Sequence, residues 1–175
     1  MRISVICGAR DSGKTRAAGT LASRLRAQGL RVGGVLSEAA LSEGEKVSYI
    51  FRDLATGRRK LYARRRQGVI PREEPGYEFL TEGVAFGCAA VRRAAAVGVD
   101  VLFVDEIGPL EAGGGGLWEP LREVISTFPG RLVITVRPAL LDWLLQESGM
   151  NSNEAIVLRP ADAETAFMPG AHGGS

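Results

Sequence analysis

The stretch "CGARDSGKTR" at residues 7–16 constrains what this chain can fold into more than any other. Gly8, Gly13, Lys14 and Thr15 match the pattern G-x-x-x-x-G-K-[ST]. In this pattern the glycines let backbone N–H groups approach a phosphate, the lysine reaches the β- and γ-phosphates, and the hydroxyl binds Mg²⁺. Lysine occurs at only two other positions, so the composition of the chain does not explain Lys14.

The segments on either side of this loop have the periodicities of a strand and a helix, the two elements that flank a phosphate loop. Residues 2–7, "RISVIC", read as a strand, and residues 13–28 place apolar side chains on one helical face. The helix therefore directs the positive end of its dipole at the loop. The loop and its flank give the candidate nucleotide-binding residues, which are Gly8, Ala9, Arg10, Asp11, Ser12, Gly13, Lys14, Thr15 and Arg16.

Strand-like and helix-like segments alternate along the rest of the chain, which favours an α/β fold with a mainly parallel sheet. Further strands are expected at "LRVGGVL", "VDVLFVDEIG", "RLVITV" and "EAIVLR". Further helices are expected at about 79–97 and 117–128 and at "ALLDWLLQES".

The segment "VSYIFRDLATGRRKLYARRR" follows a different pattern, because its side chains alternate on both sides of a turn at "ATG". It predicts an antiparallel hairpin at about 46–64, inserted on the surface of a single domain formed by residues 1–160. A Pro- and Gly-broken loop is expected at 68–77, and a flexible tail at 161–175.

The buried strand "VLFVDEIG" ends in two acidic residues, Asp105 and Glu106. An aspartate at this position can hold Mg²⁺ together with Thr15. In P-loop proteins with adjacent acidic residues, the glutamate polarises the attacking water, so Glu106 is the candidate catalytic base. That class also has an extra strand between the first strand and the acidic strand. With the five expected strands numbered along the chain, this predicts the order 5-1-4-3-2, in which strand four is "RLVITV". This order would bring Thr135 or Arg137 beside the γ-phosphate, and Arg137 is a candidate catalytic residue with Lys14.

Four motifs together resemble a known family, the P-loop nucleoside-triphosphatases of the thermophilic and cancer-related type. These are "GARDSGKT", "GGVLSE" at 33–38, "RDLATG" at 52–57 and "DEIGPLE" at 105–111. The resemblance covers roughly residues 1–158, and the "PLE" variant followed by "GGGGLW" is similar to the bacterial branch. It implies a three-layer P-loop fold and Mg²⁺-dependent hydrolysis of nucleoside 5′-triphosphates such as ATP and GTP to diphosphate and phosphate.

The composition of the chain indicates the cellular compartment and the kind of ligand to expect. No apolar run approaches the roughly 18 residues that a membrane span needs. Cys7 and Cys88 form neither a disulfide framework nor a metal-ligand spacing, which favours a reducing compartment, and we expect a cytoplasmic protein. A net charge of +2 is too small to indicate nucleic-acid binding, so a nucleoside triphosphate is the expected ligand. The sequence identifies no protein partner.

Two other functions fit the same phosphate loop. A nucleotide or small-molecule kinase would use it with an acceptor pocket, although "AGGGGLWEPL" lacks the arginines that such kinases often carry after the acidic motif. A regulatory nucleotide-binding module, for instance one serving cofactor or metal-cluster assembly, would bind without rapid turnover. A guanine-specific GTPase is disfavoured, because its base motif needs a lysine and none follows Lys60.

Overall fold

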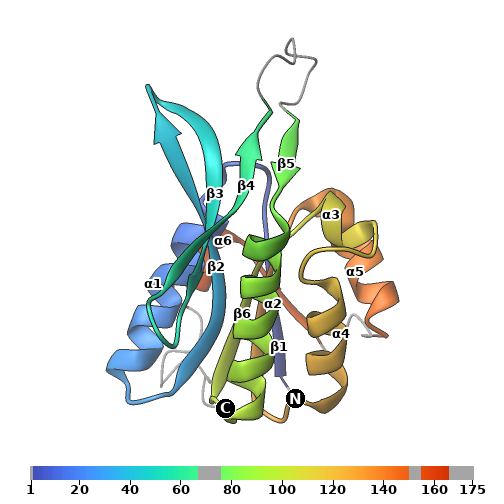
Figure 1. The fold of residues 1–175 in the computed structure, drawn as a ribbon. Helices are drawn as coiled ribbons and strands as arrows, with labels where there is room; N and C mark the ends of the chain where they lie inside the picture. Colours follow the sequence, from blue (N-terminus) through green and yellow to red (C-terminus); the bar gives the residue numbers. More distant parts are fainter. Residues whose placement is uncertain (1, 67–75, 150–154, 166–175) are drawn as a thin grey trace.

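The structure is a computed structural model that describes residues 2–66, 76–149 and 155–165 (Figure 1). Its centre is a sheet of eight strands in the order β5-β4-β3-β2-β6-β7-β1-β8. The strands are β1 Arg2–Cys7, β2 Val32–Ser42, β3 Glu45–Asp53, β4 Arg59–Arg65, β5 Tyr77–Phe79, β6 Val101–Ile107, β7 Arg131–Val136 and β8 Ala155–Leu158. The helices are α1 Lys14–Ala27, α2 Thr81–Ala96, α3 Pro109–Ala112, α4 Trp118–Thr127, the 3₁₀ turn η1 Pro138–Leu140, α5 Leu141–Glu147 and α6 Pro160–Ala163.

The parallel half of the sheet has the strand order that the sequence predicts. β1 lies between β7 and β8, and β7 separates β1 from β6, so the five parallel strands run β8-β1-β7-β6-β2. The first strand therefore does not pair with the acidic strand. Because the carboxyl ends of parallel strands share one edge, this order brings the phosphate loop, the acidic residues and the end of β7 to the same edge.

The antiparallel half differs in detail from the expected surface hairpin. β3 and β4 form the predicted antiparallel pair, but β2 continues to Ser42 and pairs with β3, so the hairpin extends the main sheet. The additional strand β5 then pairs with β4. In Figure 1 these strands project beyond the helices, at the same end of the sheet as the phosphate loop. They can therefore form one wall of a site at that loop.

The sheet is covered on both faces, which gives the three layers of the fold (Figure 1). α1 and α6 pack on one face, and α2, α4 and α5 pack on the other. Alternate residues of β6 supply both layers: Leu102 and Val104 contact the α2 side, whereas Val101 and Phe103 contact the α1 side. Trp118 and Trp143 pack against each other between α4 and α5, with ring centroids 4.7 Å apart, as their helical spacing suggests.

The two glycines of "GGVLSE" are required by close packing around β2. A Cβ on Gly33 would lie 2.7 Å from the Cβ of Ala94 in α2. Gly34 has a φ of +93°, and a Cβ there would lie 2.8 Å from the backbone nitrogen of Phe103. This half of the motif therefore fixes how β2 packs against α2 and β6, and Ser37 is left to act in the site.

The "DLATG" turn is held by a buried carboxylate. Asp53 is 1% exposed, and its side chain accepts hydrogen bonds from the N–H of Ala55, the hydroxyl of Thr56 and the guanidinium of Arg93. The last bond, at 2.7 Å, ties the β3–β4 turn to α2. The aspartate of this motif thus stabilises the turn and its packing against α2.

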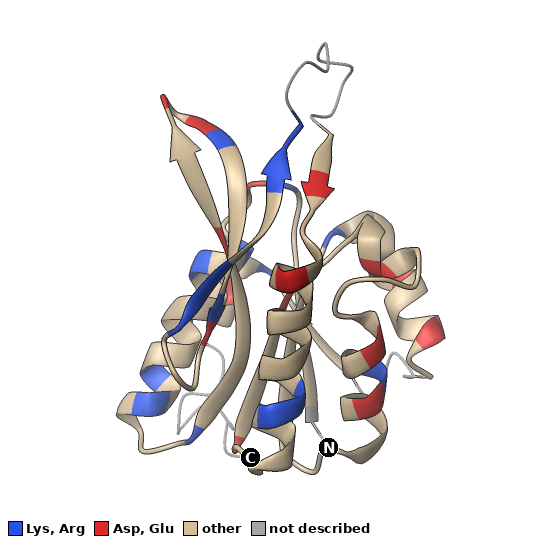
Figure 2. Ribbon diagram, in the orientation of Figure 1, with Lys and Arg blue, Asp and Glu red and all other residues tan. Residues whose placement is uncertain are grey.

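The basic residues after this turn, in the run "RRKLYARRR" at 58–66, are largely paired with acidic side chains. Arg59 contacts Glu38, Lys60 contacts Glu82, and Arg64 contacts Glu78, at 2.7–2.9 Å. Figure 2 shows acidic and basic segments interspersed over β3, β4, β5 and α2. The run is therefore an ion-paired surface of the sheet.

Short elements were not anticipated from the sequence. α3 forms within "DEIGPLE", and α6 forms at the start of the expected tail, where Ala163 is fully buried. The predicted loop at 68–77 ends in Gly76 and the first residue of β5, and its remaining residues lie outside the described ones, as does the rest of the tail from residue 166. Among the described residues, no helix is long and apolar enough to cross a bilayer.

Candidate active site

The phosphate loop connects β1 to α1 and turns twice through the left-handed region. Asp11 and Gly13 have φ values of +62° and +87°. Gly8 begins the loop, where its N–H donates to the carbonyl oxygen of Val136 at 3.2 Å. A Cβ on Gly8 would collide with the hydroxyl of Ser12. Gly13 is therefore required by its backbone conformation, whereas Gly8 occupies a crowded position beside the side chains of Ser12 and Pro160. The loop leads directly into the N-terminus of α1.

Lys14 lies folded over the loop and is 6% exposed. Its Nζ donates a hydrogen bond to the carbonyl oxygen of Ala9 at 2.8 Å. Burial lowers the pKa of Lys14, and the nearby carboxylate of Glu106 opposes this shift. A buried ammonium group with one backbone acceptor is well placed to exchange that acceptor for a phosphate oxygen.

Asp105 is buried at the end of β6 and is held from two neighbouring strands. Its Oδ2 accepts a hydrogen bond from the N–H of Ser37 at 2.9 Å, and its other oxygen accepts one from the hydroxyl of Thr135. The side chain of Thr15, the last residue of the motif, lies close enough to this carboxylate to lower its pKa. Burial and, secondly, the charge of Glu106 raise the pKa of Asp105 to about 6.

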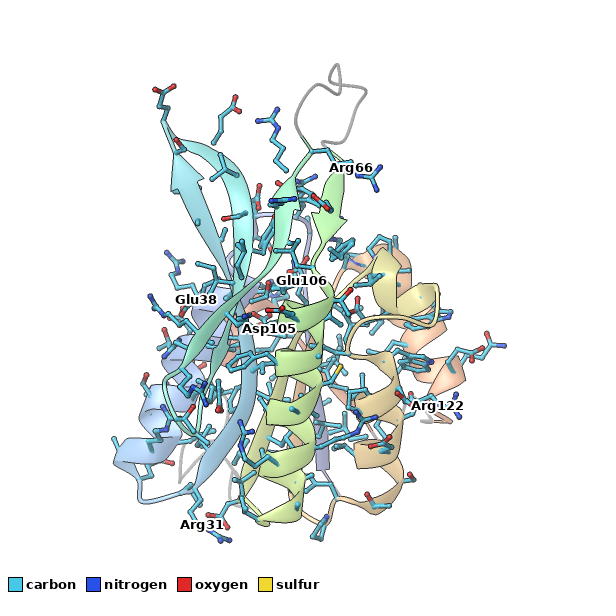
Figure 3. All side chains as sticks on the ribbon, in the orientation of Figure 1. Arg31, Glu38, Arg66, Asp105, Glu106 and Arg122 are labelled. Carbon is cyan, nitrogen blue, oxygen red and sulfur yellow. The ribbon has the colours of Figure 1, made fainter. Side chains whose placement is uncertain are left out.

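Glu106 lies in a β-bulge between β6 and β7. Val104 pairs with Ile134 and Ile107 pairs with Val136, so two residues of β6 face the single residue Thr135. Glu106 has a φ of +72°, an uncommon conformation for a residue other than glycine. Neighbouring side chains of a regular strand point to opposite faces, and a bulge changes that direction. Asp105 thus stays buried while Glu106 reaches the adjoining cavity, and Figure 3 shows both at the same end of β6.

Arg137 follows β7 and points to Glu106. Its Nη2 donates a hydrogen bond to Glu106 Oε1 at 3.3 Å, and both side chains are 25% exposed. The Nε of Arg137 is buried and has no hydrogen-bond partner among the described residues. The end of β7 therefore supplies a cation directly beside the acidic pair.

These residues surround a cavity of about 700 Å³, large enough for a nucleotide-sized ligand. The antiparallel strands close it on one side, where Lys46 of β3 forms an ion pair with Asp11 of the loop. The carboxylate of Asp11 is thus neutralised by the hairpin, and the hydrogen bond from Lys46 lowers the pKa of Asp11. The cavity is lined by Arg10, Asp11, Gly13, Lys14, Thr15, Arg16, Ser37, Ala39, Leu41, Gly44, Glu45, Lys46, Tyr49, Arg65, Tyr77, Glu106 and Arg137.

Most of the residues singled out in the sequence thus meet at one place. Six of the nine loop candidates line the cavity with Glu106 and Arg137, whereas Gly8, Ala9 and Ser12 shape the loop behind it. Asp105 is not among the residues that line the cavity, but it lies beside Thr15, which is.

The chemistry of the acidic pair suits a divalent cation. A Thr hydroxyl and a buried carboxylate are adjacent, and hard oxygen donors of this kind are those that Mg²⁺ prefers. Burial and the like charge of Glu106 raise the pKa of Asp105, so a cation bound at Asp105 would stabilise its charged form. Thr15 and Asp105 therefore fit the magnesium-binding role that the sequence suggested.

Glu111, the last residue of "DEIGPLE", organises the loop that follows Glu106. It is 5% exposed, and its two oxygens accept hydrogen bonds from the N–H groups of Gly108 at 2.9 Å and Leu117 at 3.1 Å. Burial raises its pKa to about 7. The carboxyl group therefore acts as a bridge that holds α3 and the glycine-rich segment in place.

Sequence reasoning assigned no role to several residues of the cavity wall. Ser37 holds Asp105 through its backbone, while Lys46, Tyr49 and Tyr77 come from the antiparallel strands. The scarcity of lysine could have drawn attention to Lys46. No local pattern marks the two tyrosines, because their position depends on how the strands pair.

Comparisons with known proteins agree with this architecture. The profile of a family described as NTPase matches residues 4–159. The nucleoside-triphosphatase THEP1 of Thermofilum pendens is 33% identical over 107 residues, which are 61% of this chain and 58% of that protein, so the match spans less than two thirds of the relative. The protein of the same name from Methanosarcina acetivorans is 30% identical over 128 residues, 73% of this chain and 71% of the relative.

A solved structure shares the fold. The solution structure of a human cancer-related nucleoside triphosphatase superposes with a TM-score of 0.69, covering 91% of this chain and 88% of that one. The two sequences are 21% identical, so this likeness concerns the fold.

Proposed function

Because the chain belongs to the NTPase family, we propose that it hydrolyses nucleoside 5′-triphosphates to the diphosphate and phosphate, with Mg²⁺ as cofactor. The observation that carries this proposal is the convergence of Lys14, Glu106 and Arg137 on one cavity beside the phosphate loop. The names of the sequence relatives support hydrolysis as the reaction.

Each residue has a separate part in the proposed reaction. Backbone N–H groups of the loop and the ammonium group of Lys14 bind the phosphates and stabilise the charge that develops during transfer. Glu106 orients a water molecule in line with the γ-phosphorus and accepts its proton. Arg137 contacts the γ-phosphate and, through its hydrogen bond at 3.3 Å, keeps Glu106 facing the cavity.

Mg²⁺ would be held by Thr15 and Asp105 and would neutralise charge on the β- and γ-phosphates. The raised pKa of Asp105 supports this role, because the carboxylate lacks a full counter-charge in its buried position.

Phosphoryl transfer to a second small molecule is the alternative that the structure favours among the others. An acceptor would have to lie on the Glu106 side of the γ-phosphate, and a second cavity borders Glu106 there.

The experiment that separates these reactions is a panel of ATP, GTP, CTP and UTP that measures phosphate release and identifies the nucleotide product, with and without Mg²⁺ and with and without candidate phosphoryl acceptors. We expect Mg²⁺-dependent release of one phosphate per diphosphate formed. Tight binding without turnover would favour a regulatory module, and formation of diphosphate without free phosphate would favour transfer to an acceptor.

Three further aspects stay predictions. We place the protein in the cytoplasm, and we assign it to the bacterial branch of its family, although the two sequence relatives named above come from archaea. We also propose a free nucleotide as the substrate and no nucleic acid, which is supported by the ion pairing of the basic run in β4.

A further inference from the structure

A second cavity, of about 290 Å³, lies beyond Glu106. Its walls come from β3, β4 and β5 on one side and from the segment after β6 on the other. Arg10, Tyr49, Tyr77, Glu106 and Arg137 line both this cavity and the phosphate-loop cavity, so the two share a wall. A volume of this size fits one small molecule or ring system and excludes a folded partner.

The far end of this cavity is aromatic and uncharged. Phe51 and Tyr62 stack with ring centroids 3.6 Å apart and planes 8° from parallel. The ring centroids of Phe79 and Tyr62 are 6.4 Å apart, and Phe79 is 45% exposed. Leu110 lies in the opposite wall of the cavity. Burial raises the pKa of Tyr62, so its hydroxyl stays neutral and hydrogen-bonds to Ser37. We call Phe51, Tyr62, Phe79 and Leu110 the aromatic end.

Charge is concentrated at the opposite end, on the shared wall. The ion pair between Glu106 and Arg137 lies there. Glu111 also borders the cavity, but both of its oxygens accept hydrogen bonds from backbone N–H groups. Arg10 also lines this wall, so a ligand that matches the arrangement has an apolar ring at one end and a polar group at the other.

The ligand of the second cavity is expected to be a separate molecule and not the base of the nucleotide. This inference rests on the proposed function, because it follows from how the substrate would lie in the site. With the β- and γ-phosphates at Lys14 and the attacking water at Glu106, the γ-phosphate is the substrate group nearest to the second cavity. The base lies at the opposite end of the triphosphate chain. The nucleotide would therefore have to reverse its direction to place its base among the aromatic residues.

We propose that the aromatic end binds the planar ring of a second small molecule, whose polar group faces Glu106 and Arg137. Phe79, which is 45% exposed, provides a ring contact that a saturated ring of the same outline cannot make, and the buried Phe51–Tyr62 pair forms the apolar wall beside it. This position is on the side from which a group attacks the γ-phosphate, so the ligand would lie next to the reacting water.

The first test is an NMR titration of the whole chain with 2-naphthol, with decahydro-2-naphthol as the saturated control. We expect 2-naphthol to shift signals at Phe79, Leu110 and Gly108, and to bind about 2- to 10-fold more tightly than the control, the range of one aromatic contact. Equal binding of the two compounds, or no shift at these residues, would overturn the proposal.

Variants then test whether 2-naphthol binds at the aromatic end. Phe79→Ala should weaken binding of 2-naphthol about 2- to 10-fold, and Phe79→Leu should give an intermediate value because it keeps an apolar side chain without the ring. Ile156→Ala removes a comparably exposed apolar residue from β8, where Ile156 is 54% exposed, and should leave binding unchanged. Phe79 does not line the phosphate-loop cavity, so basal triphosphate hydrolysis should be unaffected. Wild-type affinity in both Phe79 variants would contradict the assignment.

A final titration distinguishes a second molecule from the base of the substrate. With a saturating non-hydrolysable ATP analogue and Mg²⁺, 2-naphthol should still bind at the aromatic end. Competition between the two would mean that the cavity holds the base of the nucleotide and would overturn the proposal. If the analogue itself does not bind, the proposed function fails, while the titration with 2-naphthol alone still decides whether the cavity holds a ring.

Discussion

The hydroxyl group of Thr135 donates a hydrogen bond to Asp105, and the same oxygen accepts one from the N–H of Glu106 at 2.8 Å. Thr135 is 1% exposed and lies opposite the β-bulge that contains both acidic residues. One side chain of β7 thus fixes the proposed metal ligand and supports the strained backbone of the proposed base. Bulges and residues with positive φ are costly, and they persist where surrounding contacts stabilise them.

Replacing Thr135 with valine should therefore damage the site without changing its charge. The variant leaves a buried carboxylate oxygen and a backbone N–H without their partner, so we expect a loss of about 1–3 kcal/mol in the free energy of unfolding. The hydrolysis rate should fall by about 10-fold or more. Urea unfolding and steady-state phosphate release measure the two effects.

Thr135→Ser is the matched control, since it keeps the hydroxyl and removes only a methyl group. It should retain a hydrolysis rate within a few-fold of the wild type. If the valine and serine variants lose activity equally, the hydroxyl group does not organise the acidic pair.

Lys14 should be essential for turnover and dispensable for folding. Replacing it with alanine removes the charge that stabilises the transferring phosphoryl group, so the hydrolysis rate should fall by about 10²-fold or more. Its burial lowers its pKa, which means that the folded state gains little from the charge. A thermal melt should accordingly stay within a few degrees of the wild type. Normal turnover of Lys14→Ala would show that the loop is not a phosphate site.

Glu111 should make stability depend on pH near neutrality. Its folded-state pKa is about 7, above the ordinary value of 4.5, so between these values the folded protein holds a proton that the unfolded chain has released. Stability from this group is therefore greatest at low pH and decreases as pH rises towards 7, by up to about 3 kcal/mol.

The measurement is the free energy of unfolding of the wild type and of Glu111→Gln, from pH 5 to pH 8. The wild type should lose stability relative to the variant as pH rises. Glu119→Gln makes the same chemical change at an exposed position of α4 and serves as the control. A constant difference between wild type and Glu111→Gln across this range would contradict the raised pKa.

How far the sequence predicted this site depended on whether the signal was local. The phosphate loop is contiguous, and its glycines and lysine have fixed spacing, so residues 8–16 could be identified directly. The order of the parallel strands followed from two adjacent acidic residues, Asp105 and Glu106, because their class of P-loop protein places an extra strand beside β1. That order is the one observed.

The contacts that sequence reasoning missed join distant segments. The ion pair between Asp11 and Lys46 depends on the length of β2, which continues to Ser42 and so carries the hairpin over the loop, whereas the sequence indicated a strand at 30–36. The bulge at Glu106 arises from the pairing of β6 with β7, and no residue type marks it, since a glycine would have been the usual signal. Short elements such as β5 and α6 were missed because three or four residues give no measurable period.

The central claim is that Glu106 positions the water that attacks the γ-phosphate, and its most direct test is Glu106→Gln. Nucleotide affinity is measured with the non-hydrolysable ATP analogue and Mg²⁺, and turnover is measured as single-turnover hydrolysis of ATP on the same variant. The amide keeps the size of the side chain and can still accept the hydrogen bond from Arg137, but it cannot accept a proton from water. We predict an affinity within a few-fold of the wild type and hydrolysis slowed by roughly 10²-fold or more. Equal loss of affinity and turnover would assign Glu106 to metal binding or structure, and an unchanged rate would contradict the account.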